Sequence, residues 1–283
     1  MKILVTGGAG QLGLAFKRQP HLKNLIVLDR GHLDITDNSQ IEKVLKEELP
    51  EVVVNCAAWT DVDGCEENPD RAMTTNGHAV GYLAESAKEI GAKVVQISTD
   101  YVFDGHKETP YVETDLPNPL SVYGESKLLG ENLAGSDALT IRTSWVVSLD
   151  GKNMLRTILN LLESNDDLYF VDDQIGCPTF TDDLAKTILL LIDKQVSGVF
   201  HVTNTDSVSW YGFAHEVSNI VGADTRRLHP IPTTELRPQR AAPRPRNSVL
   251  ENRNLSNIGV SPLPPFSMSL KNSLEKFLHD ERN

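Results

Sequence analysis

A tyrosine and a lysine stand four residues apart in the segment Tyr123-Gly124-Glu125-Ser126-Lys127, and no other tyrosine of the chain is followed by a lysine four residues later. In a helix the two side chains share one face. A ketone that accepts a hydride must also accept a proton, which a phenol of pKa near 10 can donate when a neighbouring cation stabilises its phenolate. The pair suits ketone reduction, although by itself it is equally compatible with a surface pair of no consequence.

A hydroxyl group and a competing acid precede this pair in the sequence. Thr99 follows a strand predicted at residues 93–98, which we expect to lie beside the helix that carries Tyr123. A threonine hydroxyl there can hold a substrate carbonyl, and Lys127 can also hold the ribose of a nicotinamide. Asp100 is the rival acid, but a carboxyl of ordinary pKa is deprotonated near neutral pH. We therefore predict that Tyr123 donates the proton and that Lys127 lowers its pKa.

A glycine-rich turn at residues 6–13 (Thr-Gly-Gly-Ala-Gly-Gln-Leu-Gly) joins a buried strand predicted at residues 2–6 to a helix predicted at residues 11–18. Gly10 would let the backbone approach a pyrophosphate at the helix N-terminus, and Gly13 would allow close packing of helix and strand. A tight turn without a ligand is the alternative. Because strand, glycines and helix follow in the order typical of dinucleotide sites, we predict such a site here.

The choice of dinucleotide depends on two neighbouring residues. Asp29 ends the next predicted strand, at residues 24–28, about twenty residues after the turn, where an acid can bond the hydroxyls of the adenosine ribose. Arg30 follows it and can accept the 2′-phosphate that distinguishes NADPH from NADH. We therefore predict NADPH or NADH as the cofactor, with modest discrimination between them.

The elements that must position these residues alternate along the first half of the chain. Further strands are predicted at residues 51–56 and 139–141, and helices behind Asp37 and at residues 79–88. Asp37 and Gln40 form a capping box, and Leu49 continues the helical spacing behind it. Strands separated by helices predict crossover units, and so an α/β fold with a doubly wound, Rossmann-type parallel sheet.

The chain becomes less regular beyond residue 142, and we predict a smaller α/β substrate-binding domain above the carboxyl ends of the strands. A helix at 182–193 and a strand at 199–202 return to the main sheet, and Ser209 can cap another helix. The predicted dinucleotide-binding domain is residues 1–144 with 180–203. The predicted substrate-binding domain is residues 145–179 and 204–283.

The composition limits the classes of function. The 283 residues carry 27 Lys and Arg against 39 Asp and Glu, a net charge of −12, which argues against binding nucleic acid through an overall positive field. The longest uninterrupted apolar run, at residues 188–192, is far too short to cross a membrane. The first residues read directly into a strand, so we expect no signal peptide. Three cysteines without a pattern suit reduced thiols, and we predict a cytoplasmic protein.

These motifs together resemble the extended short-chain dehydrogenase/reductase superfamily and, within it, the dTDP-4-dehydrorhamnose reductases. The resemblance covers almost the whole chain, and the strings Ser-Thr-Asp-Tyr-Val-Phe and Arg-Thr-Ser-Trp are its most specific parts. It is carried by the glycine turn, Leu33-Asp34-Ile35-Thr36, Asn55-Cys56-Ala57-Ala58, residues 98–103, Tyr123-Gly124, residues 142–145, residues 173–179 and residues 244–248.

The resemblance implies an NAD(P)H-dependent reduction of the C4 ketone of dTDP-4-dehydro-L-rhamnose, with residue roles that follow from matching positions. The implied catalytic residues are Thr99, Tyr123 and Lys127. The implied cofactor-binding residues are Gly7, Gly10, Gln11, Leu12, Gly13, Asp29, Arg30, Asp34, Ile35, Ala57, Ala58, Thr60, Tyr123 and Lys127. The implied substrate-binding residues are Thr99, Asp100, Tyr101, Trp145, Arg246 and Asn247, and no metal ligand is implied.

The chain departs from the family pattern at two places. Ala15 stands where members that dimerise through magnesium carry a glutamate, so we expect a monomer or a weak homodimer rather than a magnesium-bridged dimer. Val146-Val147-Ser148 follows Trp145 where many members have Val-Tyr-Gly, which predicts a differently shaped sugar pocket.

The roles of two tryptophans and of one arginine-rich segment can each be interpreted in more than one way. Trp59 and Trp210 are interpreted as packing residues, with Trp59 possible beside the cofactor. The segment 226–246 holds six arginines against one acid. Such a strip is most often a solvated loop, but in an acidic chain it can also supply the local cations that a nucleotide diphosphate needs.

Three functional hypotheses follow. A nucleotide-sugar 4-ketoreductase fits best, with another reductase or an epimerase of the superfamily as the nearest alternative. A 4,6-dehydratase would need Asp-Glu directly after the threonine, whereas Thr99 is followed by Asp100 and Tyr101. A non-catalytic regulatory subunit of methionine adenosyltransferase shares the Arg-Pro-Arg-Asn string, but the complete catalytic trio favours an enzyme.

Overall fold

Six short strands form one parallel sheet in the computed structural model, which describes residues 1–19 and 24–280. Every pairing is parallel, and the order across the sheet is β2-β1-β3-β4-β5-β10. Continuous apolar runs such as that of β3 suit strands that are covered on both faces. The strands are β1 (Ile3–Thr6), β2 (Leu25–Val27), β3 (Val52–Asn55), β4 (Lys93–Thr99), β5 (Leu139–Thr143) and β10 (Gly198–His201).

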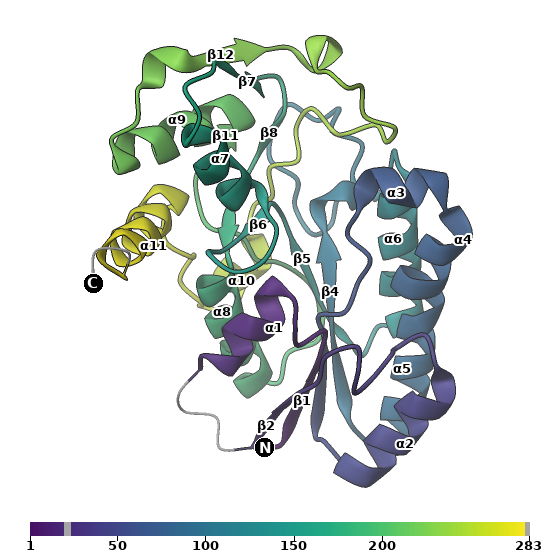
Figure 1. Cartoon of the computed structure of the whole chain (residues 1–283). Helices are drawn as coiled ribbons and strands as arrows, with labels where there is room; N and C mark the ends of the chain where they lie inside the picture. Colours follow the sequence, from purple (N-terminus) through teal and green to yellow (C-terminus); the bar gives the residue numbers. More distant parts are fainter. Residues whose placement is uncertain (20–23, 281–283) are drawn as a thin grey trace.

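Helices cover both faces of this sheet, with α2, α5 and α6 on one side and α1 and α8 on the other (Figure 1). Each face therefore has its own apolar core, one beneath α1 and α8 and one beneath α2 and α5. The helices are α1 (Gln11–Lys17), α2 (Asn38–Glu48), α3 (Val62–Glu67), α4 (Pro69–Ala72), α5 (Ala79–Glu89), α6 (Val122–Ala134) and α8 (Thr181–Asp193), with a π-helical turn η1 (Met73–His78) before α5 and a 3-10 turn η2 (Asp100–Val102) after β4.

The winding of the sheet reverses at β1. The chain runs from β1 to β2 on one side and then crosses to β3 on the other side of β1. In a doubly wound sheet, ligands bind in the crevice at the carboxyl ends of the strands on either side of such a reversal. The glycine turn follows β1 and Ala57 follows β3, so both lie at that crevice.

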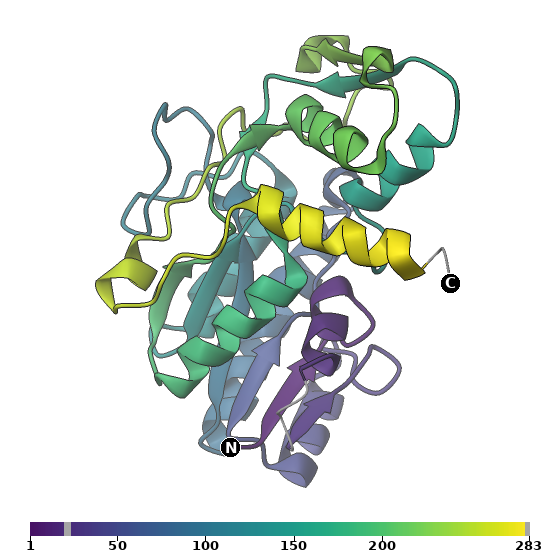
Figure 2. The ribbon, with the colours of Figure 1, turned by 90° about the vertical axis from the view of Figure 1, so that its left-hand side faces the viewer.

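A smaller part of the molecule lies above the carboxyl ends of the strands, and α11 runs between it and α8 (Figures 1 and 2). It contains short strand pairs and a separate apolar core around Phe213 and Leu270. Its elements are β6 (Val146–Val147) paired with β9 (Thr179–Phe180), β7 (Leu168–Val171) with β12 (Leu228–Ile231), β8 (Ile175–Gly176) with β11 (Val208–Ser209), the helices α7 (Met154–Leu162), α9 (Trp210–Val221) and α11 (Phe266–Asp280), and the turns η3 (Thr225–Arg227) and η4 (Thr233–Glu235). The short helix α10 (Arg253–Asn257) packs against β10 of the main sheet.

The predicted doubly wound fold is confirmed, and the predicted strands and helices are present with small shifts at their ends. Two local predictions about the second helix are wrong in part. Asp37 caps α2, and Gln40 Nε2 donates to its carboxylate at 2.9 Å. The Gln40 side-chain oxygen, however, accepts from the backbone N–H of Asp34 and not from that of Asp37, as a capping box requires. Leu49 is 63% exposed, because it ends α2 in a left-handed conformation (φ +43°) that turns it away from the core.

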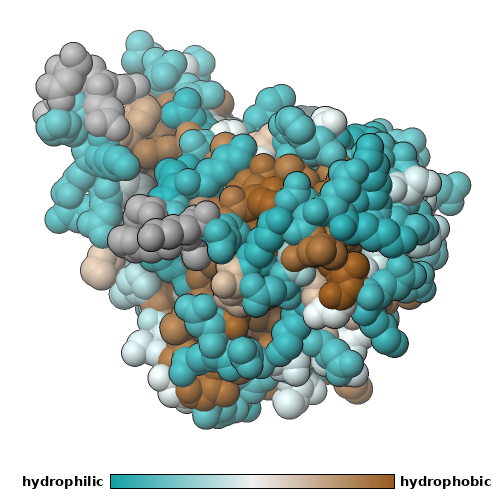
Figure 3. All heavy atoms as spheres, turned by 90° about the horizontal axis from the view of Figure 1, so that it is seen from below, coloured by the Kyte–Doolittle hydropathy of each residue, from teal (hydrophilic) through white to brown (hydrophobic). Residues whose placement is uncertain are grey.

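Seen from below, the face opposite the carboxyl ends of the strands carries mostly hydrophilic residues, with smaller hydrophobic groups between them (Figure 3). None of the helices within residues 1–19 and 24–280 combines the length and the apolar character that crossing a membrane requires.

Candidate active site

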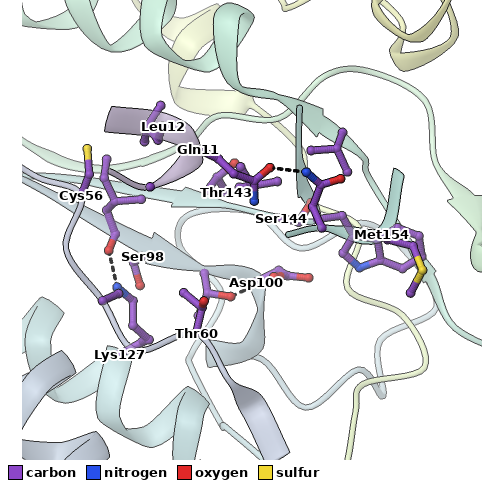
Figure 4. A pocket seen from close by; sticks show the side chains of 18 of the residues that line it. Gln11, Leu12, Cys56, Thr60, Ser98, Asp100, Lys127, Thr143, Ser144 and Met154 are labelled. Atoms are coloured by element: carbon purple, nitrogen blue, oxygen red, sulfur yellow. Dashed lines mark hydrogen bonds between the residues drawn. The ribbon is translucent and has the colours of Figure 1, made fainter. Parts of the chain in front are cut away.

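A cavity of about 380 Å³ lies at the carboxyl ends of β1, β4 and β5 (Figure 4). It brings together residues that are up to 200 positions apart in the sequence, from Gly10 to Trp210. Most of the side chains predicted for the reacting end of the site contribute to it. Among its lining residues are Gly10, Gln11, Leu12, Gly13, Ala58, Thr60, Thr99, Asp100, Tyr123, Lys127 and Trp145.

Tyr123 and Lys127 lie on one face of α6, as their spacing predicts. The hydroxyl of Ser121 caps the helix by accepting from the N–H of Gly124, so α6 begins just before the tyrosine. Both side chains are buried against the sheet. The Lys127 ammonium donates to the backbone carbonyl of Ile97 at 2.6 Å, which holds it at the end of β4 (Figure 4).

The Thr99 hydroxyl lies between the tyrosine and the aspartate. It donates to the Asp100 carboxylate at 2.9 Å and accepts from the backbone N–H of Tyr101 at 3.2 Å. It also hydrogen-bonds the Tyr123 phenol and lowers the pKa of that group. A small ligand oxygen in the cavity would therefore meet two hydroxyl groups, one from a strand end and one from a helix.

Burial shifts the pKa values of both Tyr123 and Lys127. The pKa of the Tyr123 phenol is raised, because burial outweighs the opposing hydrogen bond of the Thr99 hydroxyl, and the effect of Lys127 on this pKa stays a prediction. Burial also lowers the pKa of Lys127 to about 8, while the charge of Glu131 acts against this shift. The structure therefore keeps Tyr123 protonated near neutral pH, and the lysine is the group of this pair that titrates nearest to neutrality.

Asp100 is not a carboxyl of ordinary pKa. Burial raises its pKa to about 6, and the hydroxyls of Ser248 and Thr99 limit the rise by hydrogen bonding. One carboxylate oxygen, Oδ2, is buried and has no hydrogen-bond partner among the described residues. Near neutral pH the group is still mostly ionised, but it retains a protonated fraction that an exposed aspartate would not have.

The glycine turn is packed against the backbone that follows β3. Gly7 has a φ of +68°, and a Cβ atom there would approach the backbone nitrogen of Ala57 to 2.7 Å. At Gly13 a Cβ atom would lie 2.5 Å from the carbonyl oxygen of Gly7. Only glycine fits at both positions. The floor of the crevice is therefore bare backbone, which suits the close approach of a dinucleotide pyrophosphate.

Gln11 connects the glycine turn to the smaller part of the molecule. Its side-chain oxygen accepts from Asn153 Nδ2 at 2.8 Å and from Ser148 Oγ at 3.0 Å (Figure 4). Met154, at the start of α7, also lines this cavity. The cavity is thus closed by contacts between elements far apart in the sequence.

A second cavity, of about 260 Å³, lies beside the carboxyl end of β2 and shares Gly10, Cys56 and Ala58 with the first. Arg30 and Asp34 form an ion pair at 2.9 Å at its edge. Arg71 lies 4.1 Å above the ring of Trp59, and both line this cavity, although sequence reasoning left Arg71 out and gave Trp59 no definite role. The predicted residues that line it are Gly7, Gly10, Arg30, Asp34, Ile35, Ala57 and Ala58.

Asp29 is not among the residues that line either cavity. Its carboxylate accepts from the backbone N–H of Gly31 at 3.0 Å and bonds the His32 ring at 2.7 Å, and these bonds lower its pKa. The carboxylate that lines the second cavity is Asp34.

Trp145 is held in an unusual conformation. Its φ of +44° is rare for a residue with a side chain. The ring stacks on Trp210 with centroids 3.4 Å apart and planes within 4°, and a Cβ atom at Gly176 would lie 2.4 Å from it. Trp210 also lines the cavity, so its interpretation as only a packing residue is incomplete. No local pattern indicated this, because the stack joins β5, β8 and α9.

Three residues predicted to bind substrate lie outside the lining of both cavities. Tyr101 packs edge-on against the ring of Tyr123 at 5.7 Å. Arg246 is exposed, and its backbone carbonyl accepts from Ile175. The side-chain amide of Asn247 donates to the carbonyl of Lys107 at 2.7 Å.

The arginine-rich strip is largely bonded to the protein itself. Arg244 binds the Asp63 carboxylate of α3 at 2.8 Å, and Arg240 lies 3.5 Å from the same group. Arg226 pairs with Asp224, and Arg227 donates to the carbonyl of Asp166. The strip therefore ties the smaller part of the molecule to α3, close to the segment that carries Trp59.

The doubly wound sheet, the glycine turn and the Tyr–Lys pair define an oxidoreductase of the extended short-chain dehydrogenase/reductase class. Residues 1–279 match the family model described as RmlD substrate binding domain. The chain is 40% identical to a dTDP-4-dehydrorhamnose reductase of Burkholderia thailandensis, over 90% of this chain and 92% of that protein. The chain therefore belongs to the dTDP-4-dehydrorhamnose reductase (RmlD) family.

Solved structures agree with this assignment. A dTDP-4-dehydrorhamnose reductase from Clostridium acetobutylicum is 41% identical with a TM-score of 0.94, and the match covers 98% of this chain and all of that one. A dTDP-4-dehydrorhamnose reductase from Bacillus anthracis, solved in complex with NADP, is 33% identical with a TM-score of 0.93 and the same coverage.

Proposed function

We propose that this protein reduces the C4 ketone of dTDP-4-dehydro-L-rhamnose to the alcohol of dTDP-L-rhamnose, with NADPH or NADH as the reductant. The observation that carries the proposal is that Thr99, Tyr123 and Lys127 line the same cavity as the glycine turn. The relatives named above are reductases of this substrate class, and one of them was solved with NADP.

The residues of the cavity fit a reduced nicotinamide dinucleotide, which when bound supplies the hydride for the ketone carbon. Thr99 would turn its hydroxyl proton from Asp100 to the ketone oxygen and so orient the ketone. Tyr123 would protonate that oxygen, and its raised pKa ensures that the phenol carries its proton at the start of the step. Lys127 would hold the nicotinamide ribose and stabilise the phenolate that proton transfer leaves behind.

The remaining cofactor contacts divide between the two cavities. Gln11, Leu12, Gly13 and Thr60 would face the nicotinamide half. Asp34 and Ile35 would hold the adenosine, and Arg30 would accept a 2′-phosphate if it left its ion pair with Asp34. Asp29 would act on the ribose only indirectly, because its carboxylate stabilises the turn at Gly31 that follows β2. The remaining cofactor-binding residues would be Gly7, Gly10, Ala57 and Ala58.

The deoxysugar would lie between the catalytic residues and the tryptophan stack. Asp100 and Trp145 line the cavity there, and Trp210 joins them. Tyr101 would affect the substrate through Tyr123, because its ring packs edge-on against the Tyr123 ring. We keep Arg246 and Asn247 as contacts for the nucleotide portion, since an extended dTDP group would leave the cavity toward the smaller part of the molecule.

The domain division, oligomeric state and location complete the proposal. We propose residues 1–144 with 180–203 as the dinucleotide-binding domain, because β10 and α8 join the main sheet and its covering layer. Residues 145–179 and 204–283 would bind the sugar nucleotide. A monomer or weak homodimer follows from Ala15, and a cytoplasmic location is supported by three unpaired cysteines.

The test is turnover of dTDP-4-dehydro-L-rhamnose, prepared in a coupled reaction, with NADH and NADPH in parallel. Loss of absorbance at the nicotinamide wavelength together with formation of dTDP-L-rhamnose is the expected result. Tight binding of the cofactor without turnover of any dTDP-4-keto sugar would instead support the non-catalytic regulatory role.

A second candidate is reduction of a different 4-keto sugar nucleotide. Val146 and Val147 line the cavity directly after Trp145, at the position where the chain departs from the family pattern. Faster turnover of a dTDP-4-keto sugar with another configuration would favour this candidate, and the same assay distinguishes the two.

A further inference from the structure

A buried ion pair lies beneath the catalytic helix and takes no part in the mechanism described above. Glu131 follows Lys127 by four residues on α6, so Tyr123, Lys127 and Glu131 share one helix face. Glu131 is 8% exposed, and Arg142 on β5 is 4% exposed. Charges this deep are unfavourable unless they are paired and hydrogen-bonded.

The Glu131 carboxylate is fixed from two neighbouring strands. Arg142 donates to it through Nε at 2.9 Å and through Nη2 at 2.7 Å, and Ser98 donates through its hydroxyl at 2.5 Å. Ser98 and Arg142 are partners across β4 and β5. The same strand end therefore positions both the donor to Glu131 and the neighbouring Thr99 of the active site.

Within residues 1–19 and 24–280 no carboxylate lies at hydrogen-bonding distance from the Lys127 ammonium, which donates to the carbonyl of Ile97. Its charge state depends on the more distant charges of its surroundings, of which Glu131 favours the protonated form. The titratable groups that line the cavity with it include Tyr123 on α6, Cys56 after β3 and Asp100 after β4, and Arg142 on β5 is paired with Glu131. On the elements packed against α6, Glu66 binds the N–H of Val122 at the start of the helix, and His78, Glu85 and Lys88 are exposed.

We propose that Glu131 and Arg142 are positioning residues for the reaction, which together set the charge of the Lys127 ammonium. Glu131 keeps the ammonium protonated, and Arg142 limits how much of the carboxylate charge reaches it. The inference rests on the proposed reductase function, in which a charged Lys127 is required.

The two residues should therefore act on Lys127 in opposite directions. If protonated Lys127 is required, kcat/KM falls as pH rises through its pKa, which burial places near 8. Glu131→Gln removes the favourable negative charge, so this fall should move to lower pH by about one unit. Arg142→Met removes the opposing positive charge, so the fall should move to higher pH. The double variant removes both charges and should return close to the wild-type position.

The experiment measures kcat/KM for the keto sugar against pH at saturating NADPH for the wild type, both single variants and the double variant. Arg142→Lys and Glu131→Asp keep the charges and should leave the pH of the fall within about 0.3 unit of the wild type. Glu125→Gln is the matched control, because Glu125 is exposed on the same helix. Thermal unfolding of each variant reports the stability loss separately.

Opposite displacements in the single variants, with return in the double variant, support the proposal. Lower activity or stability with an unmoved pH profile overturns it, because a merely structural pair would produce that result. If a single variant does not fold, the double variant and the charge-conserving variants still test the proposal. A pH profile that is displaced in Arg142→Lys contradicts it. Absence of activity in the wild type would instead contradict the proposed function.

Discussion

The two cavities along the crevice hold their charged side chains in opposite ways. Around α6, Lys127, Glu131 and Arg142 are each less than 10% exposed and are bonded to the sheet. Beside β2, the Arg30 side chain is 75% exposed and pairs with Asp34 across one turn of loop. The charged side chains around α6 are thus buried, and the arginine beside β2 is exposed to solvent.

This difference has a physical consequence for function. Buried and prearranged charges act strongly on a developing alkoxide, because they need not reorganise during the reaction. An exposed ion pair is screened by solvent and contributes little, so it can exchange one partner for a ligand phosphate without great loss. We therefore expect substitutions around α6 to change the rate greatly and substitutions beside β2 to change cofactor preference slightly.

The largest effect is expected at Tyr123. Tyr123→Phe keeps the ring in its buried position but removes the proton, so turnover should fall by roughly 10²–10⁴-fold while cofactor and sugar binding persist. Steady-state kinetics combined with fluorescence titration of NADPH checks this. Asp100→Asn is the comparison variant, since the pKa of Asp100 is raised to about 6. If Tyr123→Phe keeps near-full turnover and Asp100→Asn loses it, Asp100 is the proton donor and not Tyr123.

Lys127→Met should impair both rate and cofactor binding. The substitution removes the cation beside the phenol and a contact to the nicotinamide ribose, so we expect a loss of roughly a hundredfold in kcat/KM with weaker NADPH binding. Lys88→Met, on the exposed face of α5, is the matched control. An unchanged dissociation constant for NADPH in Lys127→Met would show that Lys127 acts on the phenol alone.

Trp210→Ala should weaken sugar binding by up to about tenfold. The stacked pair with Trp145 is worth about 0.5–1.5 kcal/mol beyond its buried area, and its loss would free the Trp145 ring. KM for the keto sugar should rise more than kcat falls, and Trp210→Phe should recover most of the loss. A selective fall in kcat would place Trp210 in the chemical step and not in substrate recognition.

The smallest effect is expected at the exposed end. Arg30→Ala should weaken NADPH binding about two- to fivefold and leave NADH binding unchanged, because only NADPH carries the 2′-phosphate and the arginine is well solvated. Parallel titrations of the two cofactors check this. A loss above a hundredfold would mean that Arg30 alone determines the preference, and the contrast between the two cavities would fail.

The regular elements that carry the reacting groups were predictable from sequence. Tyr123 and Lys127 occupy one helix face because a spacing of four residues does so in any helix. Thr99 ends a strand that its β-branched residues Val94, Val95 and Ile97 indicate. Asp29 was harder to interpret, because its role depends on the local turn to His32, which a strand followed by an acid does not reveal. Trp210 and Arg71 have no local signal at all, since each reaches its cavity through packing against a distant tryptophan.

The sequence alone determined the period of strands and helices, the glycine turn and the chemical types of the reacting groups, because these depend on residues close together in the chain. Only the tertiary structure decided the protonation of those groups. The pKa values of Tyr123, Lys127 and Asp100 are shifted by burial and by partners such as Thr99 and Glu131. Desolvation depends on every element packed around a side chain, and it therefore cannot be predicted from the spacing of residues in the sequence.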